Sequence, residues 1–142
     1  MSESVTREIV LPLERDEAWR VVTEPGHLRE WLADDVEIDL VEGGRIELGW
    51  DGGGGRTGTV EKVEEPQRLV FRWRPDEPGP LDIETTVEIG LDDVEGGTRV
   101  TVVETGFEAL ATEAMAGCSA ISDWAWDMRL GTCGDLPLML AA

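Results

Sequence analysis

The residues of this chain that could perform acid–base or nucleophilic chemistry are few and widely spaced. His27 is the only histidine, and it falls at the tight turn between two expected short helices. There it would be either a general base at a cavity mouth or a solvated loop residue. A Ser-His-Asp arrangement would require it to meet Ser119 or Ser122 together with Asp123, and nothing in the spacing supports this. We therefore expect a loop residue and predict no catalytic residue.

The patterns that bind metals or phosphates are also missing from the sequence. Cys118 and Cys133 form no C-x-x-C pair, and on one helix at ~1.5 Å per residue they would lie too far apart for a disulfide. The run 52–55 is all glycine, but no Gly-Lys-Ser/Thr follows it, so it predicts a hairpin loop. The pairs 34–35 and 92–93 are expected to cap turns. We expect neither a metal nor a cofactor.

The better candidate site is formed by apolar side chains on the inner faces of the expected strands. Thr85 is the only inward residue with a polar group beyond an indole N–H, and nearly every Asp, Glu and Arg alternates outward. Catalysis needs a titratable group in the pocket, so this pattern argues against an enzyme. Indole rings can stack on a flat apolar ligand, although any single ring could simply fill the core. The expected cavity residues are Trp31, Leu48, Trp50, Phe71, Trp73, Thr85, Val87, Val102, Ile121, Trp124 and Met128.

The spacing of apolar residues predicts the elements that would position these side chains. A first strand at 9–11 ends at a proline, and two short helices follow at 15–22 and 27–32, separated by Pro25. From residue 36 onward the apolar period is two, and six strands carry one apolar and one charged face. Apolar residues at helical spacing between 118 and 128 predict a last helix that covers the sheet. The pattern predicts an α+β fold.

One domain accounts for the whole chain of 142 residues, because a chain of this size can bury about 70% of its unfolded surface. The regular fold is expected over about 5–130. Gly131, Gly134 and Pro137 interrupt the helical pattern, so an irregular or kinked tail is expected at 131–142.

The order of tryptophans and glycines resembles that of a known superfamily. The order runs Glu17-Ala18-Trp19, Pro25, Leu28, Trp31-Leu32, Gly43-Gly44, Gly58-Thr59-Val60, Leu69-Val70-Phe71-Arg72-Trp73, Gly97-Thr98-Arg99-Val100, Gly106-Phe107 and Trp124. It resembles the SRPBCC (START- or Bet v 1-like) superfamily and, within it, the AHSA1-like group named after an Hsp90 ATPase activator. The resemblance implies a helix-grip fold, in which a curved antiparallel sheet wraps around a long C-terminal helix and two short helices follow the first strand.

Three functions are compatible with this resemblance. The leading hypothesis is binding of a small hydrophobic, ring-containing molecule between the sheet and the last helix, because ligand pockets are mostly apolar. The second is co-chaperone activity on Hsp90, which we doubt because the similar domain of those activators is one part of a larger protein. The third is a polyketide cyclase- or aromatase-like enzyme, in which only Thr85, His27 and Arg45 could assist catalysis. The resemblance also allows a homodimer, although no exposed apolar stripe requires one.

The net charge narrows the range of partners. Acidic residues number 31 and basic residues 12, which gives a formal charge of -19. Such a surface repels nucleic-acid phosphates and anionic lipid, so we expect no nucleic acid and no membrane as partner. It suits a cationic partner, a high-salt cytoplasm or, as we favour, simple solubilisation. With no targeting segment and no apolar run near the ~20 residues of a membrane span, a cytoplasmic protein is expected.

Overall fold

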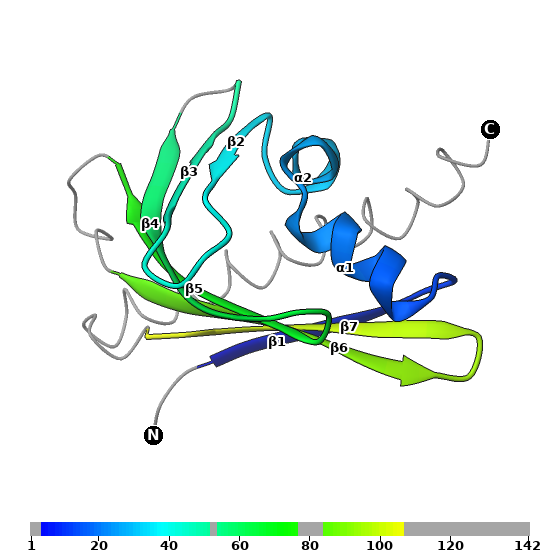
Figure 1. The fold of residues 1–142 in the computed structure, drawn as a ribbon. Coiled ribbons are helices and arrows are strands. Elements are labelled where there is room, and N and C mark those ends of the chain that lie inside the picture. The colour runs from blue at the N-terminus through cyan, green and yellow to red at the C-terminus, as the bar shows by residue number, and fades with distance from the viewer. Residues whose placement is uncertain (1–3, 52–53, 77–83, 107–142) are drawn as a thin grey trace.

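A single antiparallel sheet dominates the computed structural model, which describes residues 4–51, 54–76 and 84–106 (Figure 1). Its seven strands lie in the order β1-β7-β6-β5-β4-β3-β2. Their bounds are β1 (Ser4–Leu11), β2 (Asp35–Ile38), β3 (Arg45–Gly49), β4 (Gly55–Glu64), β5 (Arg68–Pro75), β6 (Thr85–Val94) and β7 (Gly97–Thr105). The helix expected around 118–128, both cysteines and the tail at 131–142 lie outside the described residues.

Two short helices carry the chain from edge strand β1 to the opposite edge strand β2. They are α1 (Arg15–Thr23) and α2 (Pro25–Trp31). Acidic residues in the first turn of α1 and Arg20 in its last turn match the helix dipole. Helix α1 packs against β6 and β7, and α2 packs against α1 and β2. Two helices were predicted here, but Pro25 begins α2 rather than separating the helices, because the first helical turn needs no N–H donor.

The sheet bends strongly between its two halves. In Figure 1, β2, β3 and β4 rise away from the plane of β5, β6, β7 and β1. The register of β4 against β5 shifts between Val60 and Lys62, which is a β-bulge. A bulge bends the strand that carries it, and here it lets Val60 and Val63 both contact the core although they are three residues apart. This curvature gives the sheet an inner face.

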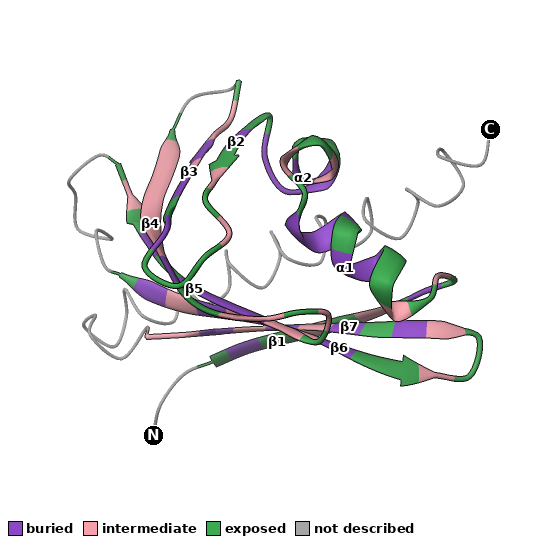
Figure 2. Cartoon of the chain, viewed as in Figure 1, coloured by how far each residue is buried: buried purple, intermediate pink, exposed green. Residues whose placement is uncertain are grey.

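The core lies between that inner face and the two helices. Along β6 the buried residues alternate as Thr85, Val87, Ile89 and Leu91, whereas the tip of the β6–β7 hairpin is exposed or half-buried (Figure 2). The apolar residues of the two helices and of the turn after α2 are buried; they include Ala18, Trp19, Val22, Leu28, Trp31 and Leu32.

Strand β1 is longer than its apolar pattern indicated. It begins at Ser4 rather than near residue 9, because it pairs with β7 along its whole length, from Ser4 opposite Thr105 to Leu11 opposite Thr98. Backbone hydrogen bonds to a neighbouring strand stabilise the extended conformation of a segment even where its apolar and polar side chains do not alternate.

The outer face of the central strands carries a ladder of ion pairs. Arg72 Nε lies 2.9 Å from Glu61 Oε1, and Arg72 Nη1 lies 3.2 Å from Glu84 Oε1. Arg68 pairs with Glu88, whose hydrogen bond raises the pKa of the guanidinium above its ordinary value. These pairs place much of the charge of β4, β5 and β6 on the side of the sheet opposite the core.

Candidate functional site

A buried carboxylate interrupts the apolar inner face of the sheet. Glu104, near the end of β7, is only 2% exposed. It follows Val100 and Val102 on the same side of the strand, and both of these valines are buried. Its register partners are Val87 on β6 and Val5 on β1, which are also buried. The carboxylate therefore lies among aliphatic side chains.

Two neighbouring side chains donate hydrogen bonds to this carboxylate. The Thr85 hydroxyl oxygen lies 2.5 Å from Glu104 Oε2, and Trp73 Nε1 lies 3.0 Å from the same oxygen. Trp73 Nε1 is also 3.1 Å from Thr85 Oγ1. The indole can only donate, so the Thr85 hydroxyl accepts from the indole and donates to Glu104. We call Trp73, Thr85 and Glu104 the polar cluster.

Aromatic and cationic groups surround the indole of Trp73. The Phe71 ring meets it edge to face, with ring centroids 5.2 Å apart and an interplanar angle of 73°. The guanidinium carbon of Arg56 lies 4.7 Å from the centroid of the Trp73 ring, within cation–π range. Trp73 itself is fully buried. Its ring is therefore held on the inner face from more than one side.

The backbone of β4 allows this close arrangement. Gly58 lies opposite Trp73 in the register, and a Cβ added at Gly58 would lie 1.8 Å from the carbonyl oxygen of Arg72. Any side chain at this position would push β4 away from β5. Glycine therefore keeps the two strands in contact beside Trp73.

The structure brings together five of the residues predicted for the cavity. Phe71 and Trp73 on β5 pair with Val87 and Thr85 on β6, and Val102 on β7 lies on the same inner face. Leu48 is buried on β3, where its register partner on β4 is Arg56. Ile121, Trp124 and Met128 lie outside the described residues.

Trp31 and Trp50 use their indole N–H groups for backbone contacts. Trp31 Nε1 donates to the Val21 carbonyl oxygen at 2.8 Å, which joins α2 to α1. Trp50 Nε1 donates to the Leu32 carbonyl oxygen at 3.2 Å, which joins the end of β3 to the end of α2. Neither residue belongs to the polar cluster.

Glu104 and Arg56 are the residues that sequence reasoning missed. The alternation of Val100 and Val102 extends to Glu104 and places it inward, so the signal was present in the sequence. The general expectation that acidic residues of the strands alternate outward is wrong at this position. Arg45 does lie outward as expected, exposed and 2.5 Å from Glu47 Oε1.

His27 lies in the first turn of α2 rather than in a loop. Its Nε2 is 3.7 Å from Glu24 Oε2, and its Nδ1 is buried with no hydrogen-bond partner among the described residues. The serines and the aspartate of the triad alternative lie outside those residues. Within residues 4–51, 54–76 and 84–106, no group of His, Cys, Asp or Glu side chains is arranged to hold a metal ion.

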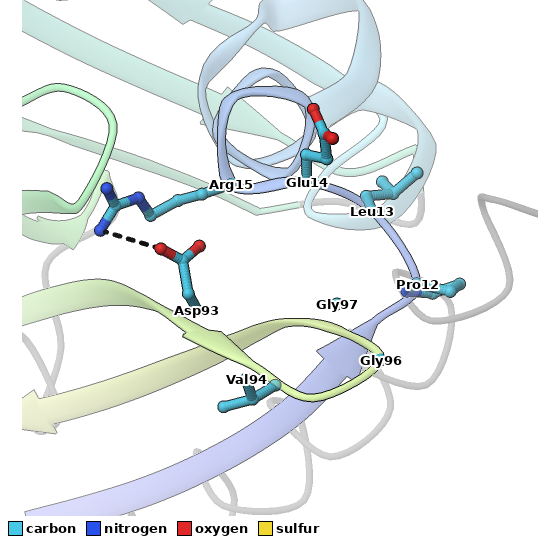
Figure 3. Close-up of a pocket in the computed structure, with 8 residues that line it drawn as sticks. All are labelled: Pro12, Leu13, Glu14, Arg15, Asp93, Val94, Gly96 and Gly97. Atoms are coloured by element: carbon cyan, nitrogen blue, oxygen red, sulfur yellow. Dashed lines mark ion pairs between the residues drawn. The ribbon is translucent and has the colours of Figure 1, made fainter.

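A separate surface hollow of about 520 Å³ lies between the β1–α1 connection and the β6–β7 hairpin (Figure 3). It is lined by Pro12, Leu13, Glu14, Arg15, Asp93, Val94, Gly96 and Gly97. Arg15 Nη1 lies 3.8 Å from Asp93 Oδ2 across it. Its lining has few apolar side chains and includes none of the polar cluster.

Comparisons with known proteins agree with this architecture. Residues 12–126 match the sequence profile of the family described as activator of Hsp90 ATPase homolog 1-like protein. Among curated proteins, none matches the chain. Neither of the two helices in the described part of the chain is long and apolar enough to cross a membrane.

Several solved structures share the fold. Protein MLL2253 from Mesorhizobium loti is 20% identical, with a TM-score of 0.84 over 94% of this chain and 96% of that chain. The Aha1 dimer from Colwellia psychrerythraea is 20% identical, with a TM-score of 0.74 over 94% of each chain. DynU16, from the dynemicin biosynthetic locus, is 24% identical, with a TM-score of 0.76 over 92% of this chain and 45% of that chain. The curved sheet and its two short helices match the helix-grip architecture, as predicted.

Proposed function

The chain belongs to the activator of Hsp90 ATPase homolog 1-like family, and on this premise we propose that it binds a small hydrophobic, ring-containing molecule against the inner face of its sheet. The observation that carries the proposal is the composition of that face, which is apolar apart from a few polar groups gathered around Trp73. Ligand sites in proteins have this character, with a mostly apolar lining and a small number of placed polar groups.

The aromatic residues of this face favour a ligand with rings. Phe71 and Trp73 already contact each other edge to face, and aromatic rings stack on or pack edgewise against further rings. The bent sheet turns these two rings and the buried Val87 and Val102 toward one side. In this proposal the ligand lies between them and the C-terminal segment of the chain.

Methyl NMR of valine-labelled protein tests the location of the site. Native mass spectrometry and a thermal-shift screen with one-, two- and three-ring aromatic compounds would first identify a binder, whose stabilisation rises with concentration. That compound should shift the methyl signals of Val87 and Val102. Val103 is the matched control, because it is adjacent to Val102 but on the other side of β7. Shifts confined to Val103 and other outward residues, or no binder at all, would refute the proposal.

Glu104 favours a second candidate function, an enzyme of the polyketide cyclase type. A buried carboxylate on the ligand-binding face could take a proton from a carbon next to a carbonyl group. The ring-containing ketone 1-tetralone in heavy water is a suitable probe, since exchange of its α-protons can be followed by NMR. Exchange that is faster with the protein than in buffer, and that is lost in Glu104→Gln, would establish this activity. Equal rates with wild type and variant would leave the chain a binding protein.

A further inference from the structure

We propose that the surface hollow between the β1–α1 connection and the β6–β7 hairpin is a second ligand site, and that it takes a small zwitterion in which an ammonium and a carboxylate group lie close together, as in an α-amino acid. The hollow shares no residue with the cavity predicted on the inner face of the sheet, so this site does not depend on the proposed function. Three features support it: the size of the hollow, the contacts that hold its walls and a pair of opposite charges at one end.

The hollow is large enough for a small molecule. Its volume of about 520 Å³ falls within the range of roughly 300–1,000 Å³ that is typical of ligand sites. The β1–α1 connection forms one wall, and Gly96 and Gly97 of the hairpin form the opposite wall (Figure 3). The charged side chains of Arg15 and Asp93 lie together at one end.

Contacts between β1 and β7 hold the two walls in place. The Thr98 hydroxyl donates to the Leu13 carbonyl oxygen at 2.9 Å, and Leu11 lies opposite Thr98 in the register. A Cβ added at Gly97 would lie 1.9 Å from the Leu11 carbonyl oxygen, so glycine lets the start of β7 lie against the end of β1. Because these contacts exist before a ligand arrives, binding costs little ordering of the backbone.

Arg15 and Asp93 face each other without a close hydrogen bond. Arg15 Nη1 lies 3.8 Å from Asp93 Oδ2, which is within ion-pair range but beyond the range of about 2.7–3.2 Å for a hydrogen bond. Neither side chain forms a hydrogen bond with any other group in residues 4–51, 54–76 and 84–106. Arg15 also begins α1, where the helix dipole disfavours a positive charge, so its guanidinium does not serve the helix. Both charged groups are therefore available to a ligand.

The two charges together define the ligand. A guanidinium only donates hydrogen bonds and a carboxylate only accepts them, so a ligand must bring an acceptor toward Arg15 and a donor toward Asp93. A carboxylate binds a guanidinium through two parallel hydrogen bonds, and an ammonium group supplies three donors. The net charge of -19 repels a free anion, and Arg15 repels a free cation. A molecule that carries both charges suits the site.

Matched probes that differ in one charged group test this selection. Leucine is compared with 3-methylbutylamine, which lacks the carboxylate, and with 4-methylpentanoate, which lacks the ammonium group. Phenylalanine, 2-phenylethylamine and 3-phenylpropanoate form a second set. The full chain, labelled with ¹⁵N-glycine, would be titrated at neutral pH and constant ionic strength, with the amide signals of Gly96 and Gly97 as reporters and that of Gly58 as the reference. We expect at least one amino acid to bind in roughly the millimolar range, and about threefold or more tightly than both of its analogues, as for half-exposed charge pairs.

Two variants and their matched controls assign the binding to the charge pair. Arg15→Gln should remove the preference for the amino acid over the amine, and Asp93→Asn should remove its preference over the carboxylate analogue. Arg20→Gln, in the same helix, and Asp92→Asn, on the other face of β6, change the net charge equally and should leave both preferences unchanged. Neither Arg15 nor Asp93 is buried, so the variants should fold, and thermal unfolding checks this.

Several results would overturn the proposal. One is that neither amino acid binds, or that each binds no more tightly than its two analogues. Another is that the preferences are the same in wild type and in the Arg15 and Asp93 variants. A third is that the amino acids shift the methyl signals of Val87 and Val102 but not the amides of Gly96 and Gly97. The hydrophobic ligand of the inner face is a different molecule, so none of these results changes the proposed function.

Discussion

Thr85 and Glu104 form a hydrogen bond of 2.5 Å on the inner face of the sheet, although they are 19 residues apart in the sequence. They are not register partners, because Glu104 lies opposite Val87, two residues beyond Thr85 on β6. Diagonal neighbours on adjacent strands lie within reach of long side chains. The bond therefore depends on the β6–β7 register, and it connects the two strands at the end where Trp73 of β5 joins them.

Replacement of Thr85 by valine should show the contribution of this bond to stability. The change keeps the shape of the side chain but removes a donor to the buried carboxylate, so the free energy of unfolding should fall by about 1–3 kcal/mol. Urea denaturation measures it. Thr86→Val, on the outward side of the same strand, should change stability by less than about 0.5 kcal/mol. In the double variant Thr85→Val/Glu104→Leu the loss should be smaller than the sum of the single losses. Additive losses would show that the two residues are not coupled.

Replacement of Gly58 by alanine should test the close approach of β4 to β5. The new Cβ would lie 1.8 Å from the Arg72 carbonyl oxygen, which is backbone and cannot move without opening the strand pair. We expect a loss of about 1–3 kcal/mol in the free energy of unfolding. Gly90 in β6 is the matched control, because nothing lies within 4 Å of a Cβ added there. Gly90→Ala should be neutral or slightly stabilising, and equal effects at both sites would contradict the structure.

Replacement of Arg72 by glutamine should test the ion-pair ladder of the outer face. It removes the pairs with Glu61 and Glu84 and adds to the net negative charge. The loss should be roughly 0.2–1 kcal/mol at low salt, as for half-exposed pairs. It should shrink between about 0.05 M and about 1 M salt because ions screen these charges. Arg20→Gln in α1 changes the net charge equally, at an exposed residue that forms no ion pair in the described part of the chain. A loss of the same size in both variants would show that net charge, not pairing, is responsible.

Much of the fold could be predicted from the sequence because it depends on local patterns. The apolar spacing around Trp19 and Trp31 predicted two helices, and the alternation of apolar and charged residues predicted most of the strands. In a helix or strand, the spacing of apolar residues along the sequence determines which side chains lie on the same face, and so which of them are buried. The family followed from the ordered tryptophans and glycines, and the match over residues 12–126 confirms it.

The details that matter for the site depend on contacts between distant segments. The bulge between Val60 and Lys62 changes which side chains of β4 point toward the core. No local sequence pattern predicted its position. Strand β1 begins at Ser4 because β7 provides a partner for its polar residues. In both cases the deciding interaction is with another strand, which the period of a single segment cannot reveal.

The sequence by itself determined the family, the class of fold and an inner face made of alternating apolar residues. Only the tertiary structure decided that Glu104 lies buried on that face with Trp73 and Thr85. The physical reason is that burial of a carboxylate is favourable only where donors from other strands meet it. Those donors come from β5 and β6, and the strand register alone brings them to β7.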